Sequence, residues 1–355
     1  MKKKMLAMLL AAAMLVSLAA CGSSGDTAAT DTAAETEETT ETTETTDAAD
    51  TADTAETEET ADTATDASDL TIGVSFGQNV HPFFVAMQLG IEAACADYGI
   101  ENVNILAADS SLETQVSQIE NLVTMGCDVI LLNPYDSDGV VNAVAAANDA
   151  GIGVITMDID CEGSTAYVAS NNVEVGRLLG EYIVEQLGGE GQIAIIDGIS
   201  VTSLKDRTDG FYEAIEGSNI EVVAEQQTAV ERDDALASAE TILQAHPDID
   251  AFVGVNENSG MAILSAVTSA GLDGDMILTC VDATAETMAA IRDGKVDVGV
   301  SQDPYQMGYI AVEQAIAWAN GETVEEFTEV PVEYMTQDNI QEFIDREAAY
   351  GVEVE

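Results

Sequence analysis

The stretch VILLNPYDSDGVVNAVAAANDAGIGVITMD, from Val129 to Asp158, contains two short apolar runs separated by a helical pattern. The runs Val129–Leu132 and Val154–Met157 are rich in Val, Ile and Leu, which predicts strands of a parallel sheet that is covered on both faces. Between them, Val140–Ala150 has helical spacing of its apolar residues and is followed by Gly151, a common helix terminator. The order strand, helix, strand predicts a βαβ unit.

The same alternation extends on both sides of this unit and predicts an α/β protein with parallel sheets. The predicted strands are Leu70–Val74, Val103–Ala107, Val129–Leu132, Val154–Met157, Ala166–Ala169, Gln192–Ile196, Val222–Ala224, Ala251–Val255, Met276–Val281 and Asp297–Ser301. The 286 residues from Leu70 to Glu355 exceed the size at which a single core usually divides. We therefore expect two Rossmann-like lobes.

The N-terminus has the pattern of an export signal. Three lysines, Lys2 to Lys4, precede an apolar run from Met5 to Ala20 that ends in small residues and is followed by Cys21. This cysteine resembles that of a bacterial lipobox, which implies a lipoprotein signal peptide at residues 1–20 and a lipid on Cys21. The alternative is an ordinary secretory signal followed by a chance cysteine. In both cases the mature protein is expected outside the cytoplasmic membrane.

Residues 21–69 are predicted to form a disordered acidic linker after the lipidated cysteine. From Asp26 to Asp69 the chain is almost entirely Thr, Ala, Glu and Asp, and it contains no basic or aromatic residue. Such a composition buries too little apolar surface to offset the entropy of ordering. The segment is interpreted as a tether or as a merely solvating tail, and a lipid anchor is the only membrane contact expected.

The folded part is strongly acidic. With 16 of the 66 acidic residues in the linker and three of the ten basic residues at the N-terminus, the remainder has a net charge near −43. This charge excludes nucleic acid as a partner, because nucleic-acid binding requires a basic surface. The remaining cysteines (Cys95, Cys127, Cys161 and Cys280) have no metal or redox spacing, and we interpret those in apolar patterns as small core residues.

Polar or aromatic side chains follow the ends of most predicted strands. In open parallel sheets, ligands bind beyond the carboxyl ends of the strands, so these residues are the candidate ligand-binding residues. They are His81, Phe83, Phe84, Asn133, Asp158, Arg207, Asn256, Asp282 and Gln302. Carboxylates, amides and a guanidinium can bind the hydroxyl groups of a sugar, and the two Phe rings offer apolar faces.

Several stretches, taken in order, resemble the periplasmic sugar-binding proteins of the ribose-binding type. They are Pro82-Phe83-Phe84-Val85, Leu132-Asn133-Pro134 with Asp136-Ser137-Asp138, Val154-Ile155-Thr156-Met157-Asp158, Asp206-Arg207 with Gly210-Phe211, Ala245-His246-Pro247-Asp248, and Gly294-Lys295. The resemblance implies a type I periplasmic-binding fold. It also implies that the protein delivers its ligand to an ABC importer. It implies a body in two lobes, residues 70–170 plus 303–330 and residues 171–302 plus 331–355, which are joined by a three-stranded hinge near Asn171, Gln302 and Pro331.

The resemblance also assigns roles to the candidate residues and shows two departures. Phe83 and Phe84 become ring-stacking residues, and the other polar candidates become hydrogen-bonding ones. His81 stands where the family has Asn, and Ile159 stands where it has Arg, so a ligand other than ribose is expected. The structural alternatives are helix caps or loop carboxylates for the Asp residues, a turn residue for Asn133, an exposed loop residue for His81, and core residues for the two Phe.

The expected function is capture of a monosaccharide or polyol by a monomeric protein and its delivery to an ABC permease. Three alternatives are presentation of the ligand to a sensor kinase or chemoreceptor, binding of a nucleoside, autoinducer-type furanosyl or amine-bearing ligand, and, more remotely, a sugar hydrolase built on Asp158 and His81. The chain lacks a Gly-x-Ser-x-Gly elbow, so we expect no enzyme and no cofactor. Asp136 to Asp138 resemble a calcium loop without its later Glu, so we expect no metal and interpret these residues as a cap of the following helix.

Overall fold

The computed structural model describes residues 67–198, 202–229, 231–352 and 354. The predicted signal peptide, Cys21 and nearly all of the predicted linker lie outside these residues. The last three residues of that linker, Ala67–Asp69, form a short 3-10 helix directly before the first strand. The prediction of disorder was therefore wrong for these three residues.

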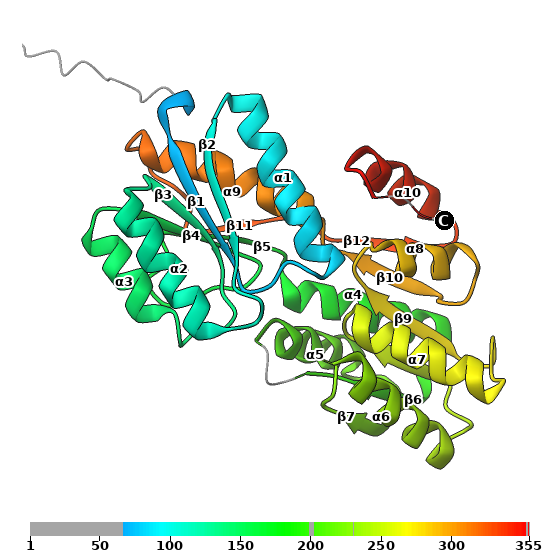
Figure 1. Cartoon of the computed structure of the whole chain (residues 1–355). Helices are drawn as coiled ribbons and strands as arrows, with labels where there is room; N and C mark the ends of the chain where they lie inside the picture. The colour runs from blue at the N-terminus through cyan, green and yellow to red at the C-terminus, as the bar shows by residue number, and fades with distance from the viewer. Residues whose placement is uncertain (1–66, 199–201, 230, 353, 355) are drawn as a thin grey trace, which may run out of the picture. The chain divides into compact units, whose positions relative to one another are not determined.

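One six-stranded parallel sheet has the order β11-β5-β4-β3-β1-β2 (Figure 1). Its strands are β1 (Thr71–Phe76), β2 (Asn102–Ala107), β3 (Val129–Asn133), β4 (Gly153–Met157), β5 (Ala166–Ala169) and β11 (Phe327–Glu329). Its helices are α1 (Pro82–Tyr98), α2 (Leu112–Met125), α3 (Val141–Asp149) and α9 (Pro304–Ala319). Buried residues of α1 and α9 form a core with one face of the sheet, and those of α2 and α3 form a core with the other face.

The second sheet has the order β12-β10-β9-β8-β6-β7. Its strands are β6 (Glu190–Ile196), β7 (Asn219–Gln226), β8 (Ala251–Gly254), β9 (Ile277–Val281), β10 (Val298–Ser301) and β12 (Glu333–Thr336). Its helices are α4 (Asn172–Leu187), α5 (Thr202–Ile215), α6 (Arg232–Ala245), α7 (Glu257–Ala270), α8 (Ala285–Arg292) and α10 (Ile340–Ala349). Apart from β12, which pairs antiparallel with β10, the strands are parallel.

The two sheets repeat one topology, because the order β5-β4-β3-β1-β2 corresponds to β10-β9-β8-β6-β7. The fold is thus α/β with two Rossmann-like lobes, as predicted, and it is the type I periplasmic-binding fold. The chain passes between the lobes near Asn171, near Gln302 and near Pro331. Two hydrogen bonds join these passages: Ser170 Oγ donates to the Gln302 carbonyl at 3.2 Å, and Val330 N donates to the Ala169 carbonyl at 2.9 Å.

Two strands of the C-terminal part, β11 and β12, were not predicted. The strands β11 and β12 have only three and four residues and carry exposed or half-buried side chains, so they lack the apolar runs of the central strands. Cys95, Cys127, Cys161 and Cys280 are buried and free, which agrees with the interpretation of Cys95 and Cys280, the two in apolar patterns, as core residues. Among the described residues, no helix combines the length and the apolar character that a membrane span requires.

Candidate functional site

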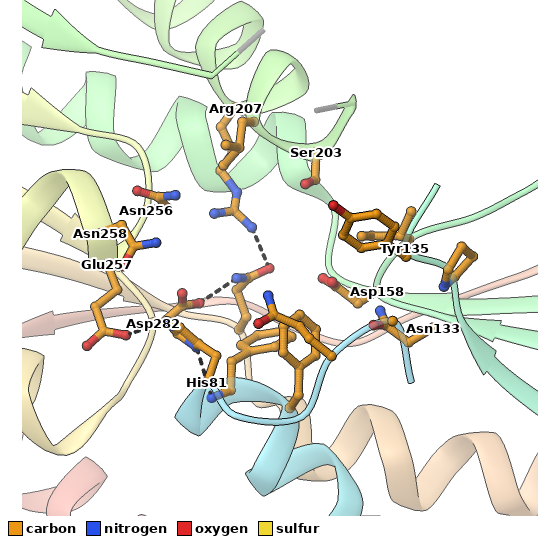
Figure 2. Close-up of a pocket in the computed structure, with 18 residues that line it drawn as sticks. His81, Asn133, Tyr135, Asp158, Ser203, Arg207, Asn256, Glu257, Asn258 and Asp282 are labelled. Carbon is orange, nitrogen blue, oxygen red and sulfur yellow. Dashed lines mark hydrogen bonds and ion pairs between the residues drawn. The ribbon is translucent and has the colours of Figure 1, made fainter. Parts of the chain in front are cut away.

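A cavity of about 250 Å³ is lined by residues from both lobes. All nine residues predicted to bind ligand are among its lining residues: His81, Phe83, Phe84, Asn133, Asp158, Arg207, Asn256, Asp282 and Gln302. They come together because most of them follow the carboxyl ends of strands, where parallel sheets form their clefts. The topology therefore concentrates residues that are more than 200 positions apart in sequence (Figure 2).

Two carboxylates occupy equivalent positions in the two lobes. Asp158 directly follows β4 and Asp282 directly follows β9, and both have left-handed backbone, with φ of 64° and 79°. The backbone N–H of Asp158 donates to Val168 and that of Asp282 donates to Val300, on the neighbouring strand in each case. Asp tolerates left-handed backbone better than most residues, and here this conformation turns the chain out of each strand. Both side chains are more than nine-tenths buried.

Arg207 on α5 is the guanidinium of the cavity. Its Nε donates to Asn172 Oδ1 at 2.9 Å, its Nη1 to the Val255 carbonyl at 3.0 Å, and its Nη2 to Gln302 Oε1 at 2.9 Å. Gln302 in turn donates from Nε2 to Asp282 Oδ1 at 2.5 Å (Figure 2). These bonds use three of the five N–H groups of Arg207 and leave two for a ligand.

Burial dominates the electrostatics of these groups. Burial raises the pKa of Asp158 to about 7, although the charge of Arg207 and the Asn133 side chain oppose this shift. Burial likewise raises the pKa of Asp282, again against the attraction of Arg207. The same desolvation lowers the pKa of Arg207, while the two carboxylates hold it up. For both carboxylates, burial thus disfavours the ionised form more than Arg207 favours it.

His81 caps the first turn of α1 and reaches the other lobe. Its Nδ1 accepts from Phe83 N–H at 3.2 Å, which places the ring proton on Nε2, 3.0 Å from Glu257 Oε2 (Figure 2). Burial alone lowers the pKa of His81, but the hydrogen bond and the charge of Glu257 raise it overall. Glu257 also accepts from Thr284 Oγ1 at 2.9 Å. His81 is thus both a helix cap and a contact between the lobes.

Two asparagines have structural bonds within the cavity wall. Asn133 Nδ2 donates to the Met157 carbonyl at 3.0 Å. Asn256 is the N-cap of α7: its Oδ1 accepts from Ser259 N–H at 2.8 Å, and its Nδ2 donates to the Ala229 carbonyl at 2.9 Å. Both side chains line the cavity, but their orientation is already determined by the protein itself.

Aromatic rings form one side of the cavity. Phe83 and Phe84 lie edge to face, with centroids 5.3 Å apart, and Phe83 is buried while Phe84 is partly exposed. Tyr135, which is half exposed, also lines the cavity. Ile159 contributes an apolar side chain next to Asp158.

Sequence reasoning missed Glu257, Tyr135, Asn258 and Ser203 as lining residues. Tyr135 lies two residues after Asn133, and Glu257 directly follows Asn256. Considering the two residues after each predicted site residue would therefore have found both. The interpretation of Asp136 to Asp138 as a helix cap was wrong. Asp136 Oδ1 accepts from Gly139 N–H at 2.7 Å within a turn, and α3 begins after Val140 without a side-chain cap.

The fold and this cavity define a two-lobed solute-binding protein of the type I periplasmic-binding class. The family model of the periplasmic binding protein domain matches residues 72–323. The ribose import binding protein of Bacillus subtilis (strain 168) is 32% identical over 272 residues, which cover 76% of this chain and 88% of that protein. The chain therefore belongs to the periplasmic binding protein family, in its ribose-binding type.

Two solved structures extend this result. An ABC transporter solute-binding protein from Bacillus halodurans C-125 with bound myo-inositol is 32% identical, with a TM-score of 0.72 and coverage of 79% of this chain and 98% of that one. A periplasmic solute-binding protein from Actinobacillus succinogenes 130z with bound D-allose is 25% identical, with a TM-score of 0.73 and coverage of 77% and 99%.

Proposed function

We propose that this protein is an extracytoplasmic solute-binding protein that captures a monosaccharide or polyol in the cavity between its lobes. The observation that carries the proposal is the pair Asp158 and Asp282, two buried carboxylates at equivalent strand ends that face one cavity together with Arg207. The ligands bound in the two solved relatives, myo-inositol and D-allose, belong to the same chemical class.

The chemistry of the wall suits a polyhydroxylated ring. Each carboxylate oxygen accepts hydrogen bonds from ligand hydroxyls, and such charge-assisted bonds are about twice as strong as neutral ones. The free N–H groups of Arg207 donate to ligand oxygens, and Phe84 offers an apolar face for the C–H surface of the ring. The protein needs no nucleophile and no cofactor for this role, and we propose that it returns its ligand unchanged.

Binding is expected to close the lobes about the three chain passages near Asn171, Gln302 and Pro331. Rotation of a few backbone angles at such passages produces hinge closure. In this proposal, residues 70–170 with 303–330 and residues 171–302 with 331–355 move as units, and an ABC permease receives the closed, monomeric complex. The similarity to the ribose import binding protein of Bacillus subtilis supports this partner.

We further propose that residues 1–20 are removed and that a lipid on Cys21 holds the protein at the membrane. Mass spectrometry of the N-terminal peptide from native membranes tests this assignment. A diacylglycerol-modified Cys21 is expected, and Cys21→Ala should release the protein from the membrane fraction. An unmodified Cys21 in the mature protein would contradict the anchor without affecting the binding proposal.

Calorimetry of the full chain with a panel of monosaccharides and polyols tests the binding function. One site per chain with micromolar or tighter affinity is expected, and NMR of the recovered ligand should show no chemical change. Uptake by cells that lack the gene separates transport from sensing. Loss of uptake supports import, whereas normal uptake with lost gene induction supports presentation to a sensor.

A further inference from the structure

The charges on the wall of the cavity do not balance. Three carboxylates line it, and each is more than nine-tenths buried: Asp158 is 8% exposed, Asp282 7% and Glu257 6%. Among the described residues that line the cavity, Arg207 is the only Lys or Arg. His81 is paired with Glu257, its Nε2 lying 3.0 Å from Oε2, so it does not form an ion pair with Asp158 or Asp282.

The carboxylates also differ in their partners. Among the described residues, the only ion pair that includes a lining carboxylate is the one between His81 and Glu257. Asp282 accepts from Gln302, but neither Asp282 nor Asp158 has a Lys or Arg nitrogen within ion-pair distance. Arg207 directs its N–H groups to Asn172, Gln302 and a backbone carbonyl instead.

A buried carboxylate without a cation is costly, and the cost disappears if the ligand supplies the positive charge. Of the three carboxylates, Asp158 is the one that we expect a cationic ligand to stabilise most. Burial raises its pKa to about 7, because the attraction of Arg207, which lies outside ion-pair distance, offsets only part of the cost of burial. Ile159, the next residue in the chain, also lines the cavity and contributes no charge that would compete with a cationic ligand.

We propose that the ligand of this cavity is a polyhydroxylated compound that carries a protonated amine, such as an amino sugar or an amino-cyclitol, with the ammonium group bound by Asp158. This inference rests on the proposed function, since it specifies the substrate class of the same site. In the proposed complex, Asp282 and the side-chain amides of the cavity bind hydroxyl groups of the ligand. The two remaining N–H groups of Arg207 donate to its ring or hydroxyl oxygens.

The test compares matched pairs that differ only by an amine in place of a hydroxyl. The probes are glucosamine and glucose, galactosamine and galactose, and scyllo-inosamine and scyllo-inositol, with N-acetylglucosamine as an uncharged control. Calorimetry of the full chain at pH 7 should show that the amine binds at least tenfold more tightly than the hydroxyl compound in the pair that fits best. N-acetylation should abolish the preference.

Two variants identify the residue responsible. Asp158→Asn should reduce the preference for the amine to less than threefold, since it removes the charge but retains the shape. Asp138→Asn is the matched control, because Asp138 is an exposed acid on the same side that does not line the cavity. If Asp158 had a purely structural role, Asp158→Asn would lower the affinities for the amine and for the hydroxyl compound by the same factor.

The pH profile is a further readout. The preference should weaken from pH 7 to pH 5, because protonation of Asp158 removes the charge that binds the amine. If the hydroxyl compound binds at least as tightly in every pair, the amine proposal is overturned and the proposed function stands. If no member of any pair and no other sugar or polyol binds, both proposals fail.

Discussion

Asp158 combines burial, a left-handed backbone and a place on the cavity wall. Asp158→Ala removes the acceptor of a buried ligand hydroxyl or amine, and it should weaken binding by about 2 kcal/mol, or ~30-fold. Calorimetry with the best ligand measures the loss. Asp138→Ala serves as a control and should bind as the wild type does. Equal affinities of Asp158→Ala and wild type would show that this carboxylate does not contact the ligand.

Ile159 lies beside Asp158 in the cavity wall, where the ribose-binding type has an arginine. Ile159→Arg introduces a guanidinium that can pair with the buried carboxylates and donate to sugar oxygens. Ribose affinity should therefore rise relative to the affinity for the native ligand. A competition assay measures this ratio, and Ile159→Leu controls for the change in packing. The prediction is wrong if ribose is already the preferred ligand of the wild type.

At the scale of elements, a glycine in each lobe allows two helices to pack closely. A Cβ on Gly176 of α4 would lie 1.8 Å from the carbonyl oxygen of Arg207 on α5, and one on Gly90 of α1 would lie 1.9 Å from that of Tyr305 on α9. These backbone contacts cannot relax without moving a helix. The first of them holds the helix that carries Arg207, so it connects helix packing to the geometry of the site.

Gly176→Ala and Gly90→Ala should each lower the free energy of unfolding by about 2–4 kcal/mol, because overpacking moves a helix. Only Gly176→Ala is expected to weaken ligand binding as well, since it displaces Arg207. Chemical denaturation and low-temperature calorimetry on the folded variants provide the two readouts. The same loss of binding in both variants would argue against a specific link through Arg207.

The C-terminal helix α10 carries a buried carboxylate. Glu347 is 3% exposed, and its Oε1 has no hydrogen-bond partner among the described residues. Burial raises its pKa to about 7, with a further contribution from Asp303. The folded state thus retains a proton that the unfolded state releases near pH 4.5, so stability should fall as the pH rises between these values.

Glu347→Gln removes this titration and should stabilise the protein at pH 8 by on the order of 2 kcal/mol, with little effect at pH 5. Thermal melts at the two pH values measure the difference. Glu342→Gln, on the exposed side of the same helix, should change neither melt by more than a degree or so. A variant that is destabilised at pH 8 would show that Glu347 is stabilised by a partner when ionised.

At the scale of the whole molecule, we expect the acidic surface to attract a basic surface of the permease. Such electrostatic attraction raises the association rate more than the affinity. Asp138 and Glu231 are exposed acids near the carboxyl ends of strands, one in each lobe. Asp138→Lys with Glu231→Lys should slow uptake by membrane vesicles and leave ligand binding in solution unchanged.

The control for this prediction is Glu101→Lys with Glu190→Lys, which changes the charge equally at the amino ends of β2 and β6. This double variant should transport normally. The difference between the two double variants should shrink as salt increases, because salt screens exposed charges. Normal uptake by the first double variant at all salt concentrations would leave the acidic surface with a solubilising role only.

The sequence was most informative where local patterns coincide with burial. Continuous apolar runs such as Val129–Leu132 predicted the central strands, since a strand covered on both faces has to be apolar throughout. The polar residues after those runs predicted nine lining residues of one cavity, because parallel strands place their carboxyl ends together. The edge strands β11 and β12 were missed, since short strands at a sheet edge depend on pairing with a neighbour rather than on their own side chains.

By itself, the sequence determined the α/β class, the two lobes and the residue types that face the cleft, because these depend on periodicity and on position relative to each strand. Only the tertiary structure decided how those residues are bonded. The contact of His81 with Glu257 and the hydrogen bonds of Arg207 to Asn172 and Gln302 join segments that are distant in sequence. Such pairings depend on where the two lobes meet, and no local pattern encodes that distance.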